Sequence, residues 1–342
     1  MKAMVLTEIT RLPENRAPLK LVELPAPVPG KGEILVKVAV CGVCHTELDE
    51  IEGRTPPARF PLILGHQIVG RVEAAGPAAT RFRPGDRVGI AWINRACGRC
   101  AFCRRGEENL CPEFKATGRD ADGGYAEYTT VSEEFAYPIP EVLNDAEAAP
   151  LLCAGAIGYR SLRLTGIRDG DNLGLIGFGA SAHLVLKLVQ QSYPKSQVFV
   201  FSRTREERDF ALELGAVWAG GFETETPEKL KGAIDTTPVW QPIIVGLQNL
   251  EKGGRLVINA IRKEEADKPA LLTLDYPRHL WLEKEIKSVA NVTRADVAEF
   301  LELAARIPIK PEFQEYPLEQ ANQALLELKE RKIRGAKVLR IA

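Results

Sequence analysis

Residues 172–182 read NLGLIGFGASA, and this stretch decides the fold of the middle of the chain. An apolar run, which predicts a buried strand, is followed by a helical pattern that starts at Ala180. The turn between them is G-x-G-x-x-A, a form of the turn that holds the phosphates of a dinucleotide. Gly177 permits the tight turn, and Gly179 lets the pyrophosphate approach the backbone. The helix points free amide groups at the phosphates, so Ala180 and Ser181 are predicted contacts, unless this is an ordinary tight turn.

Around this turn, strand and helix patterns alternate from about residue 154. The predicted strands are 172–176, 197–201, 233–235 and 255–259, and the predicted helices are 180–191 and 205–214. Such alternation is typical of a doubly wound parallel sheet, so the fold class is α/β with a Rossmann cofactor domain.

The first third of the chain follows a different pattern, with short β-branched runs separated by Pro and Gly. Its predicted strands are 33–40, 67–74, 87–91 and 126–131, which indicates a compact, barrel-like β domain. A helix is predicted over 294–306. We therefore expect two domains: residues 1–153 with 290–342, and residues 154–289 inserted between them.

The end of the second strand of the doubly wound sheet bears on the choice of dinucleotide. NAD-selective sites place Asp or Glu there, but this chain has Ser202, Arg203 and Arg205. A hydroxyl and guanidinium groups can bind the 2′-phosphate, which a carboxylate would repel. These residues favour NADP(H), while NAD(H) stays open because Glu206 and Glu207 are close enough in sequence to pair with the arginines.

Four cysteines in residues 97–111 have the spacing C-x2-C-x2-C-x7-C. They are Cys97, Cys100, Cys103 and Cys111. This spacing is typical of a closed four-thiolate zinc site, which is structural because no coordination position remains for a substrate. Disulfides or unlinked thiols are the alternatives.

Composition limits the classes of function. The 342 residues include 45 basic and 46 acidic ones, so nothing predicts a general attraction to nucleic acid or a membrane surface. The first ten residues, MKAMVLTEIT, do not resemble a secretory signal. We expect a cytoplasmic protein, in which thiols stay reduced.

Seven segments together resemble the zinc-dependent medium-chain alcohol dehydrogenases, in the cinnamyl-alcohol-dehydrogenase-like or bacterial alcohol dehydrogenase branch. They are GVCHTE at 42–47, GHQIVGRV at 65–72, GDRVGIAWI at 85–93, the four-cysteine segment, GGYAEY at 123–128, PLLCAG at 150–155 and GFGASA at 177–182. The resemblance spans essentially the whole chain. It implies a GroES-like β-barrel catalytic domain beside the Rossmann domain, with the active site in the cleft between them.

The resemblance also implies a second, catalytic zinc ion, giving two per chain. Its ligands would be Cys44, His66 and Cys153, although each residue alone has a plain structural reading. Three protein ligands leave one position for water or substrate, and the ion acts as a Lewis acid. Cys41 matches no ligand position and is expected to be a packed thiol.

Other residues near the ligands take roles from the same resemblance. Thr46 matches a proton-relay hydroxyl, or else it caps the following helix. His45 matches a contact to the cofactor pyrophosphate. Glu47 matches a carboxylate that orients a zinc ligand such as His66. Two departures concern Gln67, where many relatives have Glu, and Asp49, where His is frequent; they leave zinc exchange and the outer proton relay open.

The expected activity is hydride transfer between an alcohol and NAD(P). Trp92 and Ile93 match a segment that lines the substrate cleft in relatives, but Trp92 is equally a candidate core residue. His183 and His279 match no ligand and are expected to be structural. The alternatives are a polyol or other specialised carbonyl dehydrogenase and, more distantly, a non-enzymatic zinc-binding interaction module. A homodimer or homotetramer is expected, and the substrate is not encoded clearly.

Overall fold

A computed structural model describes residues 1–307, 309–330 and 335–341 of the chain. The chain divides into two compact units, which are described separately. Unit 1 comprises Met1–Ala156 and Val292–Ala342, and unit 2 comprises Ile157–Asn291. The predicted domain boundaries lie a few residues away. Residues 308, 331–334 and 342, which the predicted catalytic domain includes, lie outside the described part of the chain.

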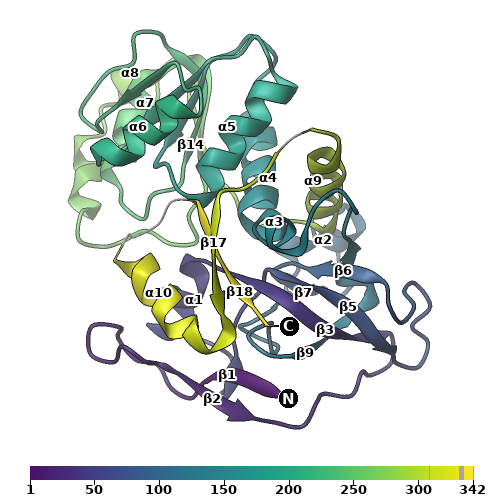
Figure 1. The fold of residues 1–342 in the computed structure, drawn as a ribbon. Coiled ribbons are helices and arrows are strands. Elements are labelled where there is room, and N and C mark those ends of the chain that lie inside the picture. Colours follow the sequence, from purple (N-terminus) through teal and green to yellow (C-terminus); the bar gives the residue numbers. More distant parts are fainter. Residues whose placement is uncertain (308, 331–334, 342) are drawn as a thin grey trace. The chain divides into compact units, whose positions relative to one another are not determined.

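Unit 2 contains a six-stranded parallel sheet in the order β13-β12-β11-β14-β15-β16 (Figure 1). This order is the doubly wound arrangement, so the predicted fold is confirmed. The strands are β11 (Leu173–Ile176), β12 (Val198–Phe201), β13 (Trp218–Gly220), β14 (Leu230–Asp235), β15 (Leu250–Ile258) and β16 (Glu285–Ser288). The helices are α4 (Ala156–Thr165), which begins at the unit boundary, α5 (Ala180–Ser192), α6 (Arg205–Glu213), α7 (Gln241–Asn249) and α8 (Tyr276–His279).

The central strands explain why the sequence reads as short apolar runs. All residues of β11 and β12 are buried, as expected for strands covered on both faces. Strands β14 and β15 begin earlier than predicted. Charged and glycine residues interrupt the apolar pattern of each strand, so the prediction missed their first residues. Periodicity alone therefore located these two strands but not their first residues.

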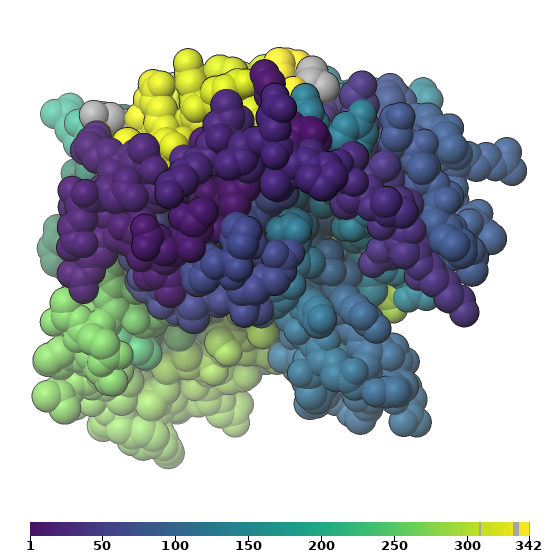
Figure 2. All heavy atoms as spheres, turned by 90° about the horizontal axis from the view of Figure 1, so that it is seen from below, coloured from purple at the N-terminus to yellow at the C-terminus, as the bar shows by residue number. Residues whose placement is uncertain are grey.

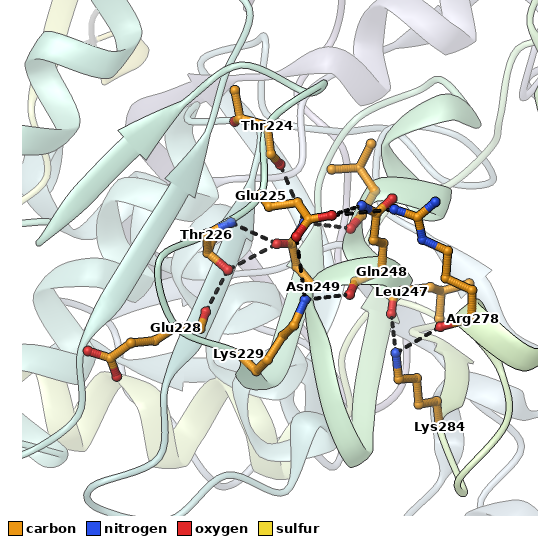
Figure 3. A network of polar contacts seen from close by, with 11 residues as sticks. Thr224, Glu225, Thr226, Glu228, Lys229, Leu247, Gln248, Asn249, Arg278 and Lys284 are labelled. Carbon is orange, nitrogen blue, oxygen red and sulfur yellow. Dashed lines mark hydrogen bonds and ion pairs between the residues drawn. The ribbon is translucent and has the colours of Figure 1, made fainter.

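A buried polar network fixes the loop that leads into β14 (Figure 3). The Asn249 side chain accepts hydrogen bonds from the backbone N–H and the hydroxyl of Thr226, at 2.8 and 3.0 Å. Its amide donates to the carbonyl of Val245 at 2.9 Å. Asn249 is fully buried, so these bonds satisfy an amide that water cannot reach. The network joins this loop to the end of α7.

Unit 1 is built on a seven-stranded sheet in the order β10-β6-β5-β3-β18-β17, with β9 also paired to β3. The strands are β3 (Glu33–Val43), β5 (Ile68–Ala75), β6 (Arg87–Ile90), β9 (Tyr128–Ser132), β10 (Ala136–Pro138), β17 (Phe313–Pro317) and β18 (Ala336–Arg340). Every pair is antiparallel except β17 with β18. Strand β3 continues three residues past its predicted end and delivers the chain directly to Cys44.

Smaller elements complete unit 1. They are the sheet β2-β1-β4, with β1 (Lys2–Leu6), β2 (Leu19–Glu23) and β4 (Leu62–Ile63), the pair β7 (Ile93–Arg95) and β8 (Lys115–Ala116), and the helices α1 (His45–Ile51), α2 (Ala101–Arg104), α3 (Asp145–Pro150), α9 (Arg294–Arg306) and α10 (Ala321–Lys329). Helix α10 lies beside α1 (Figure 1). No helix in the described residues is long and apolar enough to cross a membrane.

The first and last segments of the chain lie together, as Figure 2 shows for the purple and yellow parts. Leu19 donates its backbone N–H to Asn322 Oδ1 at 3.0 Å, and the Asn322 amide donates to the Leu19 carbonyl at 2.9 Å. The sequence did not predict β1, β2 or α10. These pairings hold the C-terminal helix over the β-rich unit.

Candidate catalytic centre and metal sites

Helix α1 presents the first candidate ligand. Cys44 is the N-cap of this helix, and its Sγ accepts the backbone N–H of Thr46 at 3.4 Å. Glu47 closes the capping box, because its Oε2 accepts the backbone N–H of Cys44 at 2.8 Å. The alternative in which Thr46 caps this helix is therefore wrong, because Cys44 occupies that position. The cap fixes the direction of the Cys44 side chain.

The second candidate ligand is His66, which precedes β5. Its Nδ1 lies 2.7 Å from Oε1 of Glu47, and both side chains are buried. Burial disfavours a charge on His66, but Glu47 and Cys44 outweigh it and raise the pKa of the imidazole. The contact at Nδ1 leaves Nε2 facing the cysteines. The predicted pairing of Glu47 with His66 is present.

Cys153 comes from an irregular helical segment. The backbone is π-helical over Leu151–Gly155, between α3 and α4, and it follows Pro150. Such single π turns redirect side chains and are frequent at functional sites. Gly155 is packed tightly here, since a Cβ at this position would lie 2.2 Å from Cε1 of Phe300 on α9. The absence of a side chain at Gly155 lets α9 support the segment that carries Cys153.

The three side chains fit one zinc ion. Cys44 Sγ and His66 Nε2 are 3.7 Å apart, and His66 Nε2 and Cys153 Sγ are 3.2 Å apart. Ligand atoms at usual bond lengths in a zinc tetrahedron lie about 3.5–3.8 Å apart, so the first distance matches and the second is a few tenths of an ångström shorter. The hydrogen bond with Cys153, followed by burial, raises the pKa of the Cys44 thiol. A divalent cation opposes that effect, because it binds the thiolate.

The four-cysteine segment forms a second compact group, with its sulfurs within 4.8 Å of one another. The Sγ of Cys103 lies 3.9 Å from that of Cys97 and 3.5 Å from that of Cys100. Hydrogen bonds from the backbone N–H groups of Arg99 and Cys100 lower the pKa of Cys97 to about 6. The thiolate form suits a metal ligand, and four sulfurs complete a tetrahedron.

An ion pair with a buried carboxylate, which sequence reasoning missed, joins this segment to α9. Glu108 is 4% exposed, and its Oε1 lies 2.8 Å from Nε of Arg294, the first residue of α9. The same oxygen accepts the backbone N–H of Arg294 at 3.3 Å. A carboxylate at a helix N-terminus also interacts favourably with the helix dipole. No local pattern indicates this pairing, because it joins distant parts of the chain.

The remaining residues near the candidate centre differ in exposure and contacts. His45 is exposed and Thr46 is half-buried at the start of α1. Asp49 is buried and forms an ion pair with Arg54. Gln67 is buried, and its side chain packs against Gly42, where a Cβ would lie 2.6 Å from Oε1. Asp49, one of the two departures from the resemblance, thus stands in a salt bridge.

The other cysteine, tryptophan and histidine candidates occupy packed positions in the two units. Cys41 is fully buried and all seven cysteines are free thiols. Trp92 is 7% exposed and packs against Phe114 in a tilted arrangement, with ring centroids 5.1 Å apart. His183 and His279 are buried, and burial lowers the pKa of His183 to about 4. Both histidines therefore suit the predicted structural role as neutral side chains.

The dinucleotide turn has the backbone that its sequence predicts. Gly177 adopts a φ of 84°, a conformation that favours glycine. Gly179 is the N-cap of α5, and a Cβ added at this position would meet no atom within 4 Å. The open position at Gly179 would let a phosphate approach the backbone and the N-terminus of α5. Ala180 and Ser181 form the first turn of that helix.

The residues after β12 do not pair as expected. The hydroxyl of Ser202, which is buried, hydrogen-bonds to the carboxylate of Glu207. Arg205 lies 3.5 Å from Asp209, and Arg203 is exposed. The first turn of α6 thus directs Glu207 toward Ser202 at the end of β12, and Arg205 contacts Asp209.

Comparison with known proteins gives full-length matches. Residues 30–141 match the alcohol dehydrogenase GroES-like domain. The chain is 44% identical over 334 residues to a probable alcohol dehydrogenase, AdhA, of Mycobacterium tuberculosis, covering 96% of this chain and 94% of that protein. It is 32% identical over 353 residues to an alcohol dehydrogenase of Geobacillus stearothermophilus, covering 100% and 99%. A solved cinnamyl alcohol dehydrogenase of Sorghum bicolor is 25% identical, with a TM-score of 0.83 and coverage of 99% and 97%.

These matches agree with the GroES-like and parallel-sheet folds of the two units. The relatives named above are dehydrogenases of alcohols, and they match along almost their whole length. The protein is thus an oxidoreductase that acts on small-molecule alcohols or aldehydes. The chain belongs to the zinc-dependent medium-chain alcohol dehydrogenase family, with its GroES-like domain in unit 1.

Proposed function

We propose that Cys44, His66 and Cys153 hold a catalytic zinc ion and that the four-cysteine segment holds a structural one, about two zinc ions per chain. The observation that carries this proposal is the convergence of three ligand atoms from three distant segments. Among the described residues, no fourth Cys, His, Asp or Glu joins that group, whereas the other group has four sulfurs. Three ligands suit an open, catalytic coordination sphere.

The residues around this centre suit alcohol oxidation and aldehyde reduction. When bound, the zinc ion would supply Lewis-acid chemistry at the substrate oxygen, and the nicotinamide would accept or deliver the hydride. Two thiolates and a neutral imidazole would balance the charge of the ion. Glu47 holds Nδ1 of His66, so the imidazole keeps one orientation with Nε2 directed at the two sulfurs.

For the proton released by the alcohol, we propose a relay through the hydroxyl of Thr46, with His45 near the cofactor phosphates. Thr46 is half-buried and His45 is exposed, and these exposures suit a path from the buried centre to the surface. Asp49, on the same helix, forms an ion pair with Arg54. The test is kcat: Thr46→Ala should lower it by about 10²–10⁴-fold, as expected for lost proton transfer, with zinc content unchanged.

Thr46→Ser is the matched control, because it keeps the hydroxyl and the helical position. It should retain most of the activity. Equal losses in the alanine and serine variants would contradict the relay role, since a general packing defect would then explain both.

We propose NADP(H) as the cofactor of unit 2, bound at Gly177, Gly179, Ala180 and Ser181. Arg203 and Arg205 would hold the 2′-phosphate next to Ser202. Glu207 is the observation that favours NAD(H), because its carboxylate already binds the Ser202 hydroxyl and would repel a phosphate. The proposal therefore requires the Ser202 hydroxyl to release its hydrogen bond to Glu207 and to bond to the 2′-phosphate instead.

The cofactor proposal is tested by the ratio of the NADPH and NADH dissociation constants. Joint replacement of Arg203 and Arg205 by alanine should weaken NADPH by about tenfold or more, while NADH changes little. Glu207→Gln should shift the ratio toward NADPH. Arg278→Ala, at an exposed arginine on α8, is the control. An unchanged ratio in the double arginine variant would remove the physical basis of the NADP(H) proposal.

The oligomeric state, the cellular location and the substrate class are proposed from the family and the composition. We propose a homodimer or homotetramer in the cytoplasm, where its free thiols would stay reduced. We propose that Trp92, which is buried, would be an apolar neighbour for aliphatic or aromatic substrates. A panel of primary alcohols, aldehydes and polyols separates this activity from that of a polyol dehydrogenase. Light scattering of the full-length enzyme measures the oligomeric state.

A further inference from the structure

The loop that follows β14 lies against the dinucleotide turn. In the sheet order, β11 and β14 are neighbours at the point where the strand order reverses, which is where doubly wound folds bind ligands. A Cβ at Gly177 would lie 2.7 Å from Oγ1 of Thr236 and 3.1 Å from Cγ2 of Thr237. The conformation of this loop therefore determines the width of the crevice beside the turn.

One buried lysine contacts the backbone of this loop. The Lys263 ammonium bonds to the carboxylate of Asp235 and donates to the carbonyls of Thr237 at 2.8 Å and Val239 at 2.9 Å. The Lys263 side chain is 7% exposed and that of Asp235 is fully buried. An ammonium group has three N–H donors, and these three acceptors use all of them. Two of the three bonds hold the loop backbone rather than the strand.

The same segment after β15 holds the loop at two further points. The backbone N–H of Glu264 donates to the carbonyl of Pro238 at 2.6 Å. Asp267 Oδ2 accepts the N–H groups of Trp240 and Gln241, at 2.7 and 2.9 Å. The segment from Lys263 to Asp267 thus follows the loop from β14 to the start of α7.

We propose that Lys263 is a positioning residue for the nicotinamide half of the cofactor. This inference rests on the proposed binding of a nicotinamide dinucleotide by unit 2. In a doubly wound fold the pyrophosphate binds at the first turn, the adenosine ribose at the end of the second strand, and the other half across the switch point. Lys263 acts on the loop at that last position, away from Ser202 after β12. It holds the crevice in the shape that accepts the nicotinamide half before the cofactor binds.

The test uses the full-length, zinc-loaded protein and compares an intact cofactor with its adenosine half. Wild-type protein is first titrated with NADPH and NADH; absence of binding by both would contradict the proposed function itself. The cofactor that binds more tightly is then compared with its adenosine fragment, which is 2′,5′-ADP for NADPH and 5′-AMP for NADH. Lys263→Met should raise the dissociation constant of the intact dinucleotide by about tenfold, as expected for loss of a charged hydrogen bond, and that of the fragment by less than about twofold.

A second variant covers the effect of leaving the buried Asp235 carboxylate with its hydrogen bonds from Thr237 but without its cationic partner. The double variant Lys263→Met with Asp235→Asn removes both charges, so it tests the loop contacts without an isolated buried carboxylate. It should show the same selective loss. Lys268→Met is the control, since Lys268 is exposed and pairs with Glu265 at 3.0 Å. Equal weakening of cofactor and fragment, or no weakening of either in the double variant, would overturn the positioning role.

Discussion

Glu47 should control zinc binding because it contacts two candidate ligands at once. One carboxylate oxygen lies 2.7 Å from Nδ1 of His66, and the other accepts the backbone N–H of Cys44 at 2.8 Å. Glutamine has one acceptor oxygen and one NH2 group, so Glu47→Gln keeps only one of these contacts. In either orientation of the glutamine amide, its NH2 group faces the N–H group of one candidate ligand, so two donors meet and that contact is lost.

The expected cost can be estimated from that lost contact. A buried donor without a partner costs about 1–3 kcal/mol, and loss of a group that orients a metal ligand typically costs about 10–100-fold in metal affinity. That range corresponds to about 1.4–2.8 kcal/mol. We therefore expect the weaker of the bound zinc ions to dissociate about 10–100 times more readily from Glu47→Gln, as measured by competition with a chromophoric chelator.

Glu50→Gln is a matched control for replacing a buried glutamate of helix α1 by glutamine. Glu50 is on the same helix and fully buried, and its carboxylate has no hydrogen-bond partner among the described residues. The difference between the two variants isolates the contact with His66 and Cys44. Equal zinc affinity in Glu47→Gln and Glu50→Gln would refute the reasoning.

Two further predictions concern stability. Hydrogen bonds from Lys337 and Tyr316 lower the pKa of Glu327 from 4.5 to about 2, so its stabilisation should be complete above pH 4.5 and lost as the pH falls toward 2. Glu327→Gln should lower the free energy of unfolding by about 1–3 kcal/mol at pH 7. The difference in Tm between the wild type and Glu327→Gln should narrow in acid, and a difference that stays constant would contradict this. Gly155→Ala should cost about 1–3 kcal/mol and reduce zinc content, because the added Cβ would meet Phe300. Adding Phe300→Leu to Gly155→Ala should restore part of the lost Tm, measured by thermal denaturation. A wild-type Tm and zinc content in Gly155→Ala would contradict the close packing.

The sequence predicted the features that depend on neighbouring residues. The four cysteines fall within fifteen residues, and the dinucleotide turn follows directly after its strand, so local spacing was sufficient for both. The π-helical turn at Cys153 has no such signal, since its apolar neighbours resemble an ordinary core segment. Only the resemblance to a family connected Cys153 with Cys44 and His66.

Long-range polar pairs account for most of what the sequence did not predict. Glu108 meets Arg294 across 186 positions, and Lys263 meets Asp235 across 28. Such pairs depend on how sheets and loops bring distant segments together, which periodicity does not describe. The pairing of Ser202 with Glu207 is local, yet its direction depends on how α6 begins after β12.

The central claim is that two separate zinc sites exist and that the three-ligand site carries the catalysis. The most direct measurement is zinc content, together with alcohol oxidation, in the wild-type enzyme and in Cys153→Ser and Cys97→Ser. We predict about two zinc ions per chain in the wild type and about one in Cys153→Ser, with its activity lost and its four-cysteine site still loaded. Cys153→Ser with wild-type zinc content and activity would contradict the account.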